Sequence, residues 1–123
     1  MRVAVTADVH LSNEHPERAE HFEKLIKALS DDGVRELIVA GDLFDQGSSS
    51  VPTFDRLAER HGTLRFHVIR GNHDARLRAE QIAAGNVRVY DEPTVLRIGN
   101  APFVFLPYGG GAGNAISMGE ALE

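Results

Sequence analysis

The sequence predicts an α/β protein: a parallel βαβαβ sheet with helices packed on it, followed by the start of a second sheet. Three short runs of apolar residues are continuous rather than alternating, which is typical of buried parallel strands. The segments between these runs have apolar residues at helical spacing. Each apolar run also ends directly in Asp, Asn or His side chains, so polar chemistry follows every predicted strand.

Strands and helices alternate through the first half of the chain. The first helix is expected where apolar residues recur at i, i+3, i+4 and i+7, and Pro52 suits the first turn of the second. Short helical crossovers imply parallel neighbouring strands with right-handed connections. The expected elements are a strand at 3–7, a helix at 17–30, a strand at 37–40, a helix from 52 to about 60, and a strand at 64–69.

The second half contains shorter elements. Residues 75–84 have weak helical character, and residues 87–90 predict a short strand. Residues 95–98 and 102–106 flank Gly99-Asn100, a pair typical of a hairpin turn. These last strands would begin the second sheet.

The C-terminal residues 109–123 form a separate segment. They are rich in glycine and then show capping-box spacing from Ser117 to Glu120, which is how a helix begins. A helix of about one turn is not stable alone. We therefore expect residues 1–108 to be the N-terminal part of a domain and residues 109–123 to contain the start of a truncated helix.

Composition limits the classes of function. With 123 residues, 42% hydrophobic and 25% charged, one globular domain is expected. The net charge of −5 argues against a pure nucleic-acid-binding module but not against a nuclease, because bound cations change the local field. The absence of cysteine excludes disulfides and thiolate metal sites. A metal would be held by oxygen and imidazole nitrogen, which favours manganese, iron, zinc or magnesium.

Nothing in the sequence predicts a membrane protein. The first apolar run meets Asp8 too early for a signal peptide, and no run approaches the length of a transmembrane helix. We therefore expect a cytoplasmic protein.

The polar segments after the three strands are the candidate site. They are Asp8-x-His10, Gly41-Asp42-x-x-Asp45 and Gly71-Asn72-His73-Asp74. Each alone could also be a polar turn. Together they follow three strands whose carboxyl ends meet at one edge, the place where α/β sheets bind ligands, and their residue types bind divalent cations.

These three motifs resemble the first motifs of the calcineurin-like metallophosphoesterases, over residues 1 to about 108. Within that superfamily, Asp8-Val9-His10-Leu11, Gly41-Asp42-Leu43-Phe44-Asp45 and Leu106-Pro107-Tyr108 resemble the SbcD-like DNA repair exonucleases most closely. The resemblance implies an α/β/β/α sandwich of four layers, incomplete here. It also implies DNA as substrate and an ATPase partner subunit, and it is compatible with a homodimer.

The resemblance further implies two divalent metal ions, most often Mn²⁺, with a metal-activated hydroxide that attacks phosphorus in line. The implied metal ligands are Asp8, His10, Asp42 and Asn72. Among them Asp42 would bridge the two metals. His73 would act near the leaving group, oriented by Asp45, while the resemblance gives Asp74 no clear role.

The chain departs from the family pattern after His73. The family supplies further histidines there, one isolated and then a Gly-His-x-His segment, and this sequence has none. The earlier histidines are expected to be structural or solvated, although His15 could approach substrate: His15, His21, His61 and His67. The chain alone is therefore expected to show little or no activity.

Three hypotheses remain open. The first is the N-terminal part of a DNA exonuclease that hydrolyses phosphodiester bonds. The second keeps the chemistry but acts on a phosphomonoester, a nucleotide or a phosphoprotein. The third is a folded fragment without catalysis.

Overall fold

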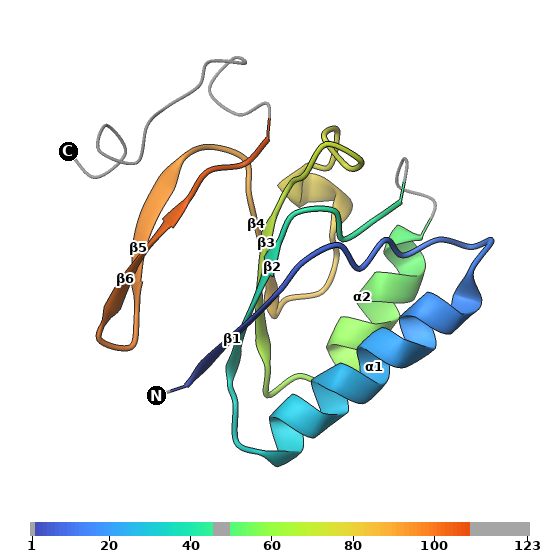
Figure 1. Cartoon of the computed structure of the whole chain (residues 1–123), viewed down its shortest axis with the longest axis horizontal. Helices are drawn as coiled ribbons and strands as arrows, with labels where there is room; N and C mark the ends of the chain where they lie inside the picture. The colour runs from blue at the N-terminus through green and yellow to red at the C-terminus, as the bar shows by residue number, and fades with distance from the viewer. Residues whose placement is uncertain (1, 46–49, 109–123) are drawn as a thin grey trace.

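The computed structural model describes residues 2–45 and 50–108, whose arrangement is shown in Figure 1. Four parallel strands form one sheet in the order β1-β2-β3-β4, and an antiparallel hairpin, β5-β6, forms a second. The elements are β1 (Val3–Thr6), α1 (Pro16–Asp31), β2 (Glu36–Ala40), α2 (Val51–Arg60), β3 (Arg65–Ile69), the 3₁₀ turn η1 (Ala79–Gln81), β4 (Val87–Tyr90), β5 (Thr94–Ile98) and β6 (Ala101–Phe105).

The helices α1 and α2 cover one face of the parallel sheet, and the hairpin lies against the other (Figure 1). Strand β2 is buried on both faces, because Leu37 and Val39 join the cluster under the helices while Ile38 joins the cluster under the hairpin. This explains why its sequence is apolar without alternation. The predicted α/β architecture, a parallel sheet plus the start of a second sheet, is confirmed.

The hairpin side has a small core built around stacked aromatic rings. Tyr90 of β4 and Phe105 of β6 stack with ring centroids 4.3 Å apart, and Ile38 and Ile98 complete the buried cluster. Strand β1 lies at the edge of the parallel sheet, where Val5 is 63% exposed.

Most predicted strand and helix ends differ from the structure by one residue, and two differences have an identifiable cause. Pro16, expected in the preceding loop, lies in the first turn of α1, where its missing N–H costs no hydrogen bond. Of the weak helix expected at 75–84, only η1 forms, because side chains bind the local backbone: Arg70 donates to the carbonyl of Leu77 at 3.1 Å, and Asp55 accepts from the N–H groups of residues 83 and 84.

The C-terminal segment 109–123, expected to contain the start of a truncated helix, lies outside the described residues. Among the residues that are described, no helix is long and apolar enough to cross a membrane.

Candidate metal centre

The carboxyl ends of β1, β2 and β3 meet at one edge of the sheet. Thr6 pairs with Val39, and Ala40 with Ile69, so the three following segments leave the sheet together. The first two then continue side by side: the N–H of Asp8 donates to the carbonyl of Gly41 at 3.1 Å, and that of His10 to the carbonyl of Asp42 at 3.0 Å. The predicted convergence of the motifs therefore rests on backbone hydrogen bonds.

The backbone is strained at the site. Within the described residues, Asp8, His10 and Asp42 are the non-glycine residues with positive φ, at 56°, 52° and 55°. A side chain in this left-handed region costs about 1–3 kcal/mol, and such residues cluster at functional sites. The strain turns these side chains out of the strand geometry at the point where the strands end.

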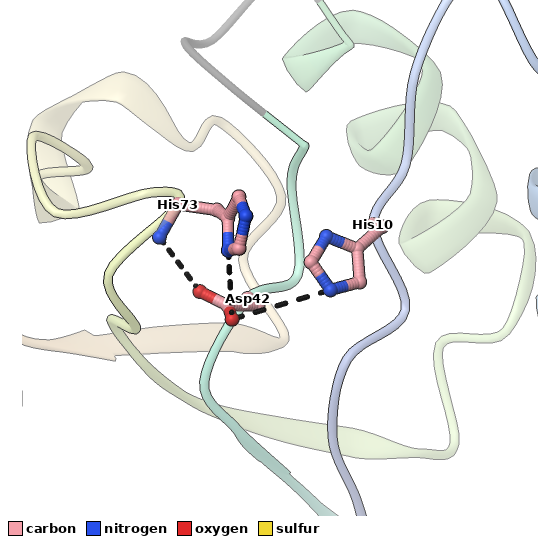
Figure 2. Close-up of side chains that lie close together, drawn as sticks. All are labelled: His10, Asp42 and His73. Carbon is pink, nitrogen blue, oxygen red and sulfur yellow. Dashed lines mark hydrogen bonds and ion pairs between the residues drawn. The ribbon is translucent and has the colours of Figure 1, made fainter.

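Figure 2 shows His10, Asp42 and His73 gathered in one cluster. One ligand atom from each residue lies within 4.8 Å of the others. Asp42 Oδ2 is 3.2 Å from His73 Nδ1 and 4.0 Å from His10 Nε2. The two imidazole rings pack edge to face, with their centroids 4.8 Å apart. Two imidazoles and a carboxylate therefore face a common centre.

Asp42 is the buried member of the cluster, with 10% of its side chain exposed. Burial alone raises the pKa of its carboxyl group and is the largest single influence. Hydrogen bonds from the backbone N–H and the imidazole of His73, with the attraction of both imidazoles, outweigh burial and hold the pKa of Asp42 below its ordinary value. Asp42 is thus held as an anion, the form that binds a cation.

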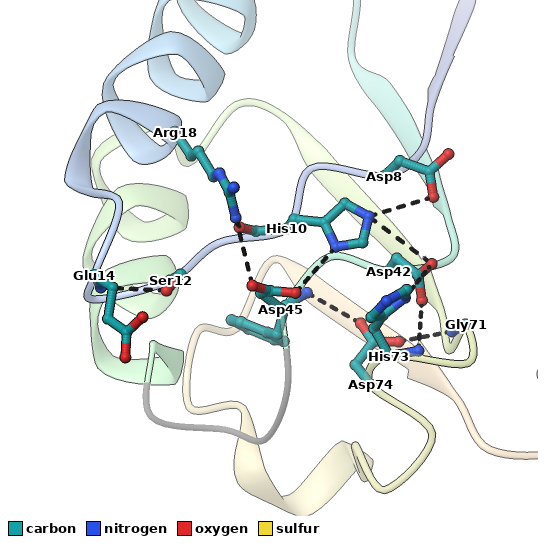
Figure 3. Close-up of polar contacts among 11 residues, drawn as sticks. Asp8, His10, Ser12, Glu14, Arg18, Asp42, Asp45, Gly71, His73 and Asp74 are labelled. Carbon is teal, nitrogen blue, oxygen red and sulfur yellow. Dashed lines mark hydrogen bonds and ion pairs between the residues drawn. The ribbon is translucent and has the colours of Figure 1, made fainter.

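Asp8 adds a second carboxylate on the open side of the cluster (Figure 3). Its Oδ1 lies 3.7 Å from His10 Nε2, and 70% of the side chain is exposed. His10 Nε2 therefore stands between two carboxylates, Asp8 and Asp42, which come from different strand ends.

Asp45 contacts the other nitrogen of His10 (Figure 3). Its Oδ1 lies 3.4 Å from His10 Nδ1, and its Oδ2 lies 3.5 Å from the guanidinium of Arg18. Arg18 also donates to the carbonyl of His10 at 3.1 Å. The predicted role of Asp45, to orient His73, stays a prediction. In the structure Asp45 lies beside the imidazole of His10, and Asp42 is the carboxylate that lies beside His73.

Asn72 is exposed in the bend between Gly71 and His73. No side-chain hydrogen bond or ion pair of Asn72 is found among the described residues, so its role as a metal ligand stays a prediction. The remaining histidines lie away from the cluster: His15 lies 3.3 Å from Glu17, His61 lies 2.9 Å from Glu23, His21 is exposed, and His67 is buried beside Tyr90.

The structure gives Asp74 a role that its motif left open. The side chain is buried, and its two oxygens accept hydrogen bonds from the backbone N–H groups of Phe44, at 3.1 Å, and Gly71, at 2.6 Å. It therefore joins the second motif to the third.

The contribution of Arg18 to the site was not predicted from the sequence. Its position gave no signal, because Arg18 and Asp45 are 27 residues apart in the sequence.

Gly71 lets the second and third motifs approach each other. A Cβ at this position would press against the Asp42 carboxylate and lie 2.6 Å from the Asp42 backbone nitrogen. No side chain fits there, so Gly71 is required by space.

The donor set fits a divalent cation. Imidazole nitrogen with carboxylate oxygen suits manganese, iron or zinc. The position of Asp45 at His10 Nδ1 leaves Nε2 toward the cluster, which is the usual arrangement of a metal-binding histidine and the carboxylate that orients it. His10 and Asp42 would hold the ion, with Asp8 on the exposed side and the imidazole of His73 next to them.

Comparison with known proteins agrees with this geometry. The sequence matches the family model of the calcineurin-like phosphoesterases over residues 1–118. The crystal structure of the nuclease MPE of Pseudomonas putida is similar, with a TM-score of 0.58 and 28% sequence identity. The match covers 76% of this chain and 50% of that chain, so this chain spans about half the length of the nuclease.

No curated protein matches the sequence. The family match, however, extends over nearly all of the 123 residues and includes the three motifs that converge in the structure. The chain belongs to the calcineurin-like phosphoesterase family.

Proposed function

We propose that this chain is the N-terminal part of a metal-dependent phosphodiesterase that acts on DNA, of the exonuclease type. The observation that carries the proposal is the convergence of His10, Asp42 and His73 from three separate strand ends. Family membership supports phosphoester hydrolysis, and the similarity to a nuclease favours a phosphodiester of a nucleic acid. The resemblance of the motifs to the SbcD-like exonucleases favours DNA.

The side chains divide the chemistry between them. Asp8, His10, Asp42 and Asn72 would hold divalent cations, two in the complete site, with Mn²⁺ favoured over iron, zinc or magnesium. When bound, these cations activate water and offset the negative charge that develops on the phosphate. His73 has 40% of its side chain exposed, so it can reach substrate and donate a proton to a leaving oxygen.

The site in the 123 residues is incomplete under this proposal. No histidine follows His73, so the ligands of the second metal are largely missing. We expect turnover by this chain far below the range of about 1–10³ s⁻¹ typical of enzymes. Robust hydrolysis by the chain as it stands would overturn the prediction of an incomplete site without overturning the phosphodiesterase.

The substrate class is tested by assaying the chain with Mn²⁺ against linear DNA, bis(4-nitrophenyl) phosphate and 4-nitrophenyl phosphate. We expect whatever activity is measured to favour the diesters and to disappear in Asp42→Asn, but not in the exposed control Glu59→Gln. A preference for the monoester would favour a phosphatase. Metal binding without hydrolysis of any of the three would favour a fragment without catalysis.

Four further properties remain predictions: the ATPase partner, a homodimer, a role in DNA repair and the cytoplasmic location.

A further inference from the structure

A cleft of about 430 Å³ opens beside the metal centre, on the side of the hairpin. Asp8 and Asp42 are among the residues that line it. Its lining is more apolar than polar and includes Ile69, Val104 and Leu106. One cleft therefore combines carboxylates, suited to a cation that would bind a phosphate, with apolar side chains suited to a flat apolar group.

Tyr108 also lines this cleft, and it is 56% exposed. Its backbone is fixed, because its N–H donates to the carbonyl of Arg70 at 3.1 Å, directly after β3. Within the part of the chain that the structure describes, no other aromatic ring stacks on it. Tyr108 is thus an aromatic ring held at a set position, with a face available to a ligand.

Arg70 is a second feature of the cleft that points to a ligand. Its side chain is 9% exposed, and two hydrogen bonds anchor it to Asp91. One terminal nitrogen donates to Asp91 Oδ1 at 3.2 Å, and the other donates to the backbone carbonyl of Asp91 at 2.8 Å. Its Nε is buried and has no hydrogen-bond partner among the described residues. The guanidinium of Arg70 is therefore a positive charge held in place at the wall of the cleft, on the side chain of a residue that lines it.

We propose that this cleft binds the nucleotide next to the scissile phosphate, with its base stacked on Tyr108 and with the guanidinium of Arg70 contributing positive charge at the wall. The inference rests on the proposed function and names the feature of DNA that the site recognises. Stacking accepts every base, and the apolar wall offers no pattern of donors and acceptors to a base edge. The nucleotide is therefore bound without sequence preference.

Binding tests this without requiring turnover. The probe is a fluorescein-labelled thymidylate oligomer, titrated with the chain in the presence of Mg²⁺ and followed by fluorescence anisotropy. Tyr108→Ala should bind about 5- to 140-fold more weakly, the range for losing one stacked base, whereas Tyr108→Phe should bind like the wild type. An oligomer of the same length with abasic residues should bind both forms equally.

Because Tyr108 is exposed, both variants should fold, which circular dichroism checks. If the wild type binds thymidylate and Tyr108→Ala binds it equally well, the stacking proposal is overturned while the proposed function stands. If Tyr108→Ala loses affinity for the abasic oligomer to the same degree, the ring does not act on a base, and the proposal is overturned as well. If the wild type binds metal but neither oligomer, DNA is not the substrate, and the two proposals fail together.

Discussion

The carboxylate of Asp74 accepts a hydrogen bond from the backbone N–H of Phe44 at 3.1 Å, across 30 residues of sequence. The same carboxylate accepts from the N–H of Gly71, and it is buried. Asp74 therefore fixes the third motif against the second and sets the distance between Asp42 and His73. The fourth residue of the Gly-Asn-His-Asp motif builds the site without entering the metal cluster.

Replacing Asp74 should destabilise the fold. Asp74→Ala leaves the buried N–H of Phe44 and the partly buried N–H of Gly71 without their charged acceptor, so we expect the free energy of unfolding to fall by about 2–4 kcal/mol. Urea denaturation measures the change, and Glu59→Gln on the surface of α2 is the control, with no change beyond about 0.5 kcal/mol. A loss as small as that of the control would show that Asp74 does not hold the motifs together.

Gly71→Ala should disturb the site through space alone. The added Cβ would lie against Asp42, so we expect a loss of about 1–3 kcal/mol in stability together with weaker metal binding. Gly85→Ala is the matched control, because nothing lies within 4 Å of a Cβ at that position. Thermal unfolding and a Mn²⁺ titration of both variants measure the effects. Equal behaviour of the two variants would contradict the close approach of Gly71 to Asp42.

Asp45 should control metal affinity through His10. Removing the carboxylate in Asp45→Ala frees the imidazole to change its tautomer and orientation, and we expect the affinity for Mn²⁺ to fall about 10- to 100-fold. Calorimetric titration measures the affinity, and ¹⁵N NMR of the histidine side chains shows which ring changes its tautomer. A change at His73 with His10 unaffected would support the role predicted from sequence instead.

Stability should decrease at mildly acidic pH because of His67. Its imidazole lies under the hairpin, 2.8 Å from the hydroxyl of Tyr90 and 3.6 Å from Glu36, with Arg65 and Arg88 nearby. Burial lowers the pKa of His67 below its ordinary value of 6.5, and the attraction of Glu36 only partly opposes this.

The unfolded chain therefore takes up a proton at His67 at a higher pH than the folded chain. The free energy of unfolding should fall as the pH drops through about 6.5, and this contribution should level off below the folded pKa. Denaturation curves between pH 8 and about pH 5 measure the slope for the wild type and for His67→Gln. An unchanged slope in His67→Gln would show that another group causes the loss.

Local patterns of sequence predicted most of the fold. The apolar run of β2 and the helical spacing of apolar residues in α1 follow from which side chains are buried. Such patterns can be recognised within each segment alone. The candidate site was predicted in part, because the ends of parallel strands must meet, and this brought His10 and Asp42 together. The contact of Asp45 with His10 and that of Asp74 with Phe44 were not predictable, since each joins segments that lie far apart in the sequence.

The most direct test is to titrate the ¹⁵N-labelled chain with Mn²⁺ and follow the paramagnetic broadening of its NMR signals. If the three strand ends share one cation, the signals of Asp8, His10, Asp42 and His73 should broaden together at the lowest metal concentrations. Asp42→Asn should abolish that selectivity. Broadening spread evenly over exposed carboxylates such as Asp31 and Asp32 of the wild type, with no preference for the strand ends, would contradict the metal centre.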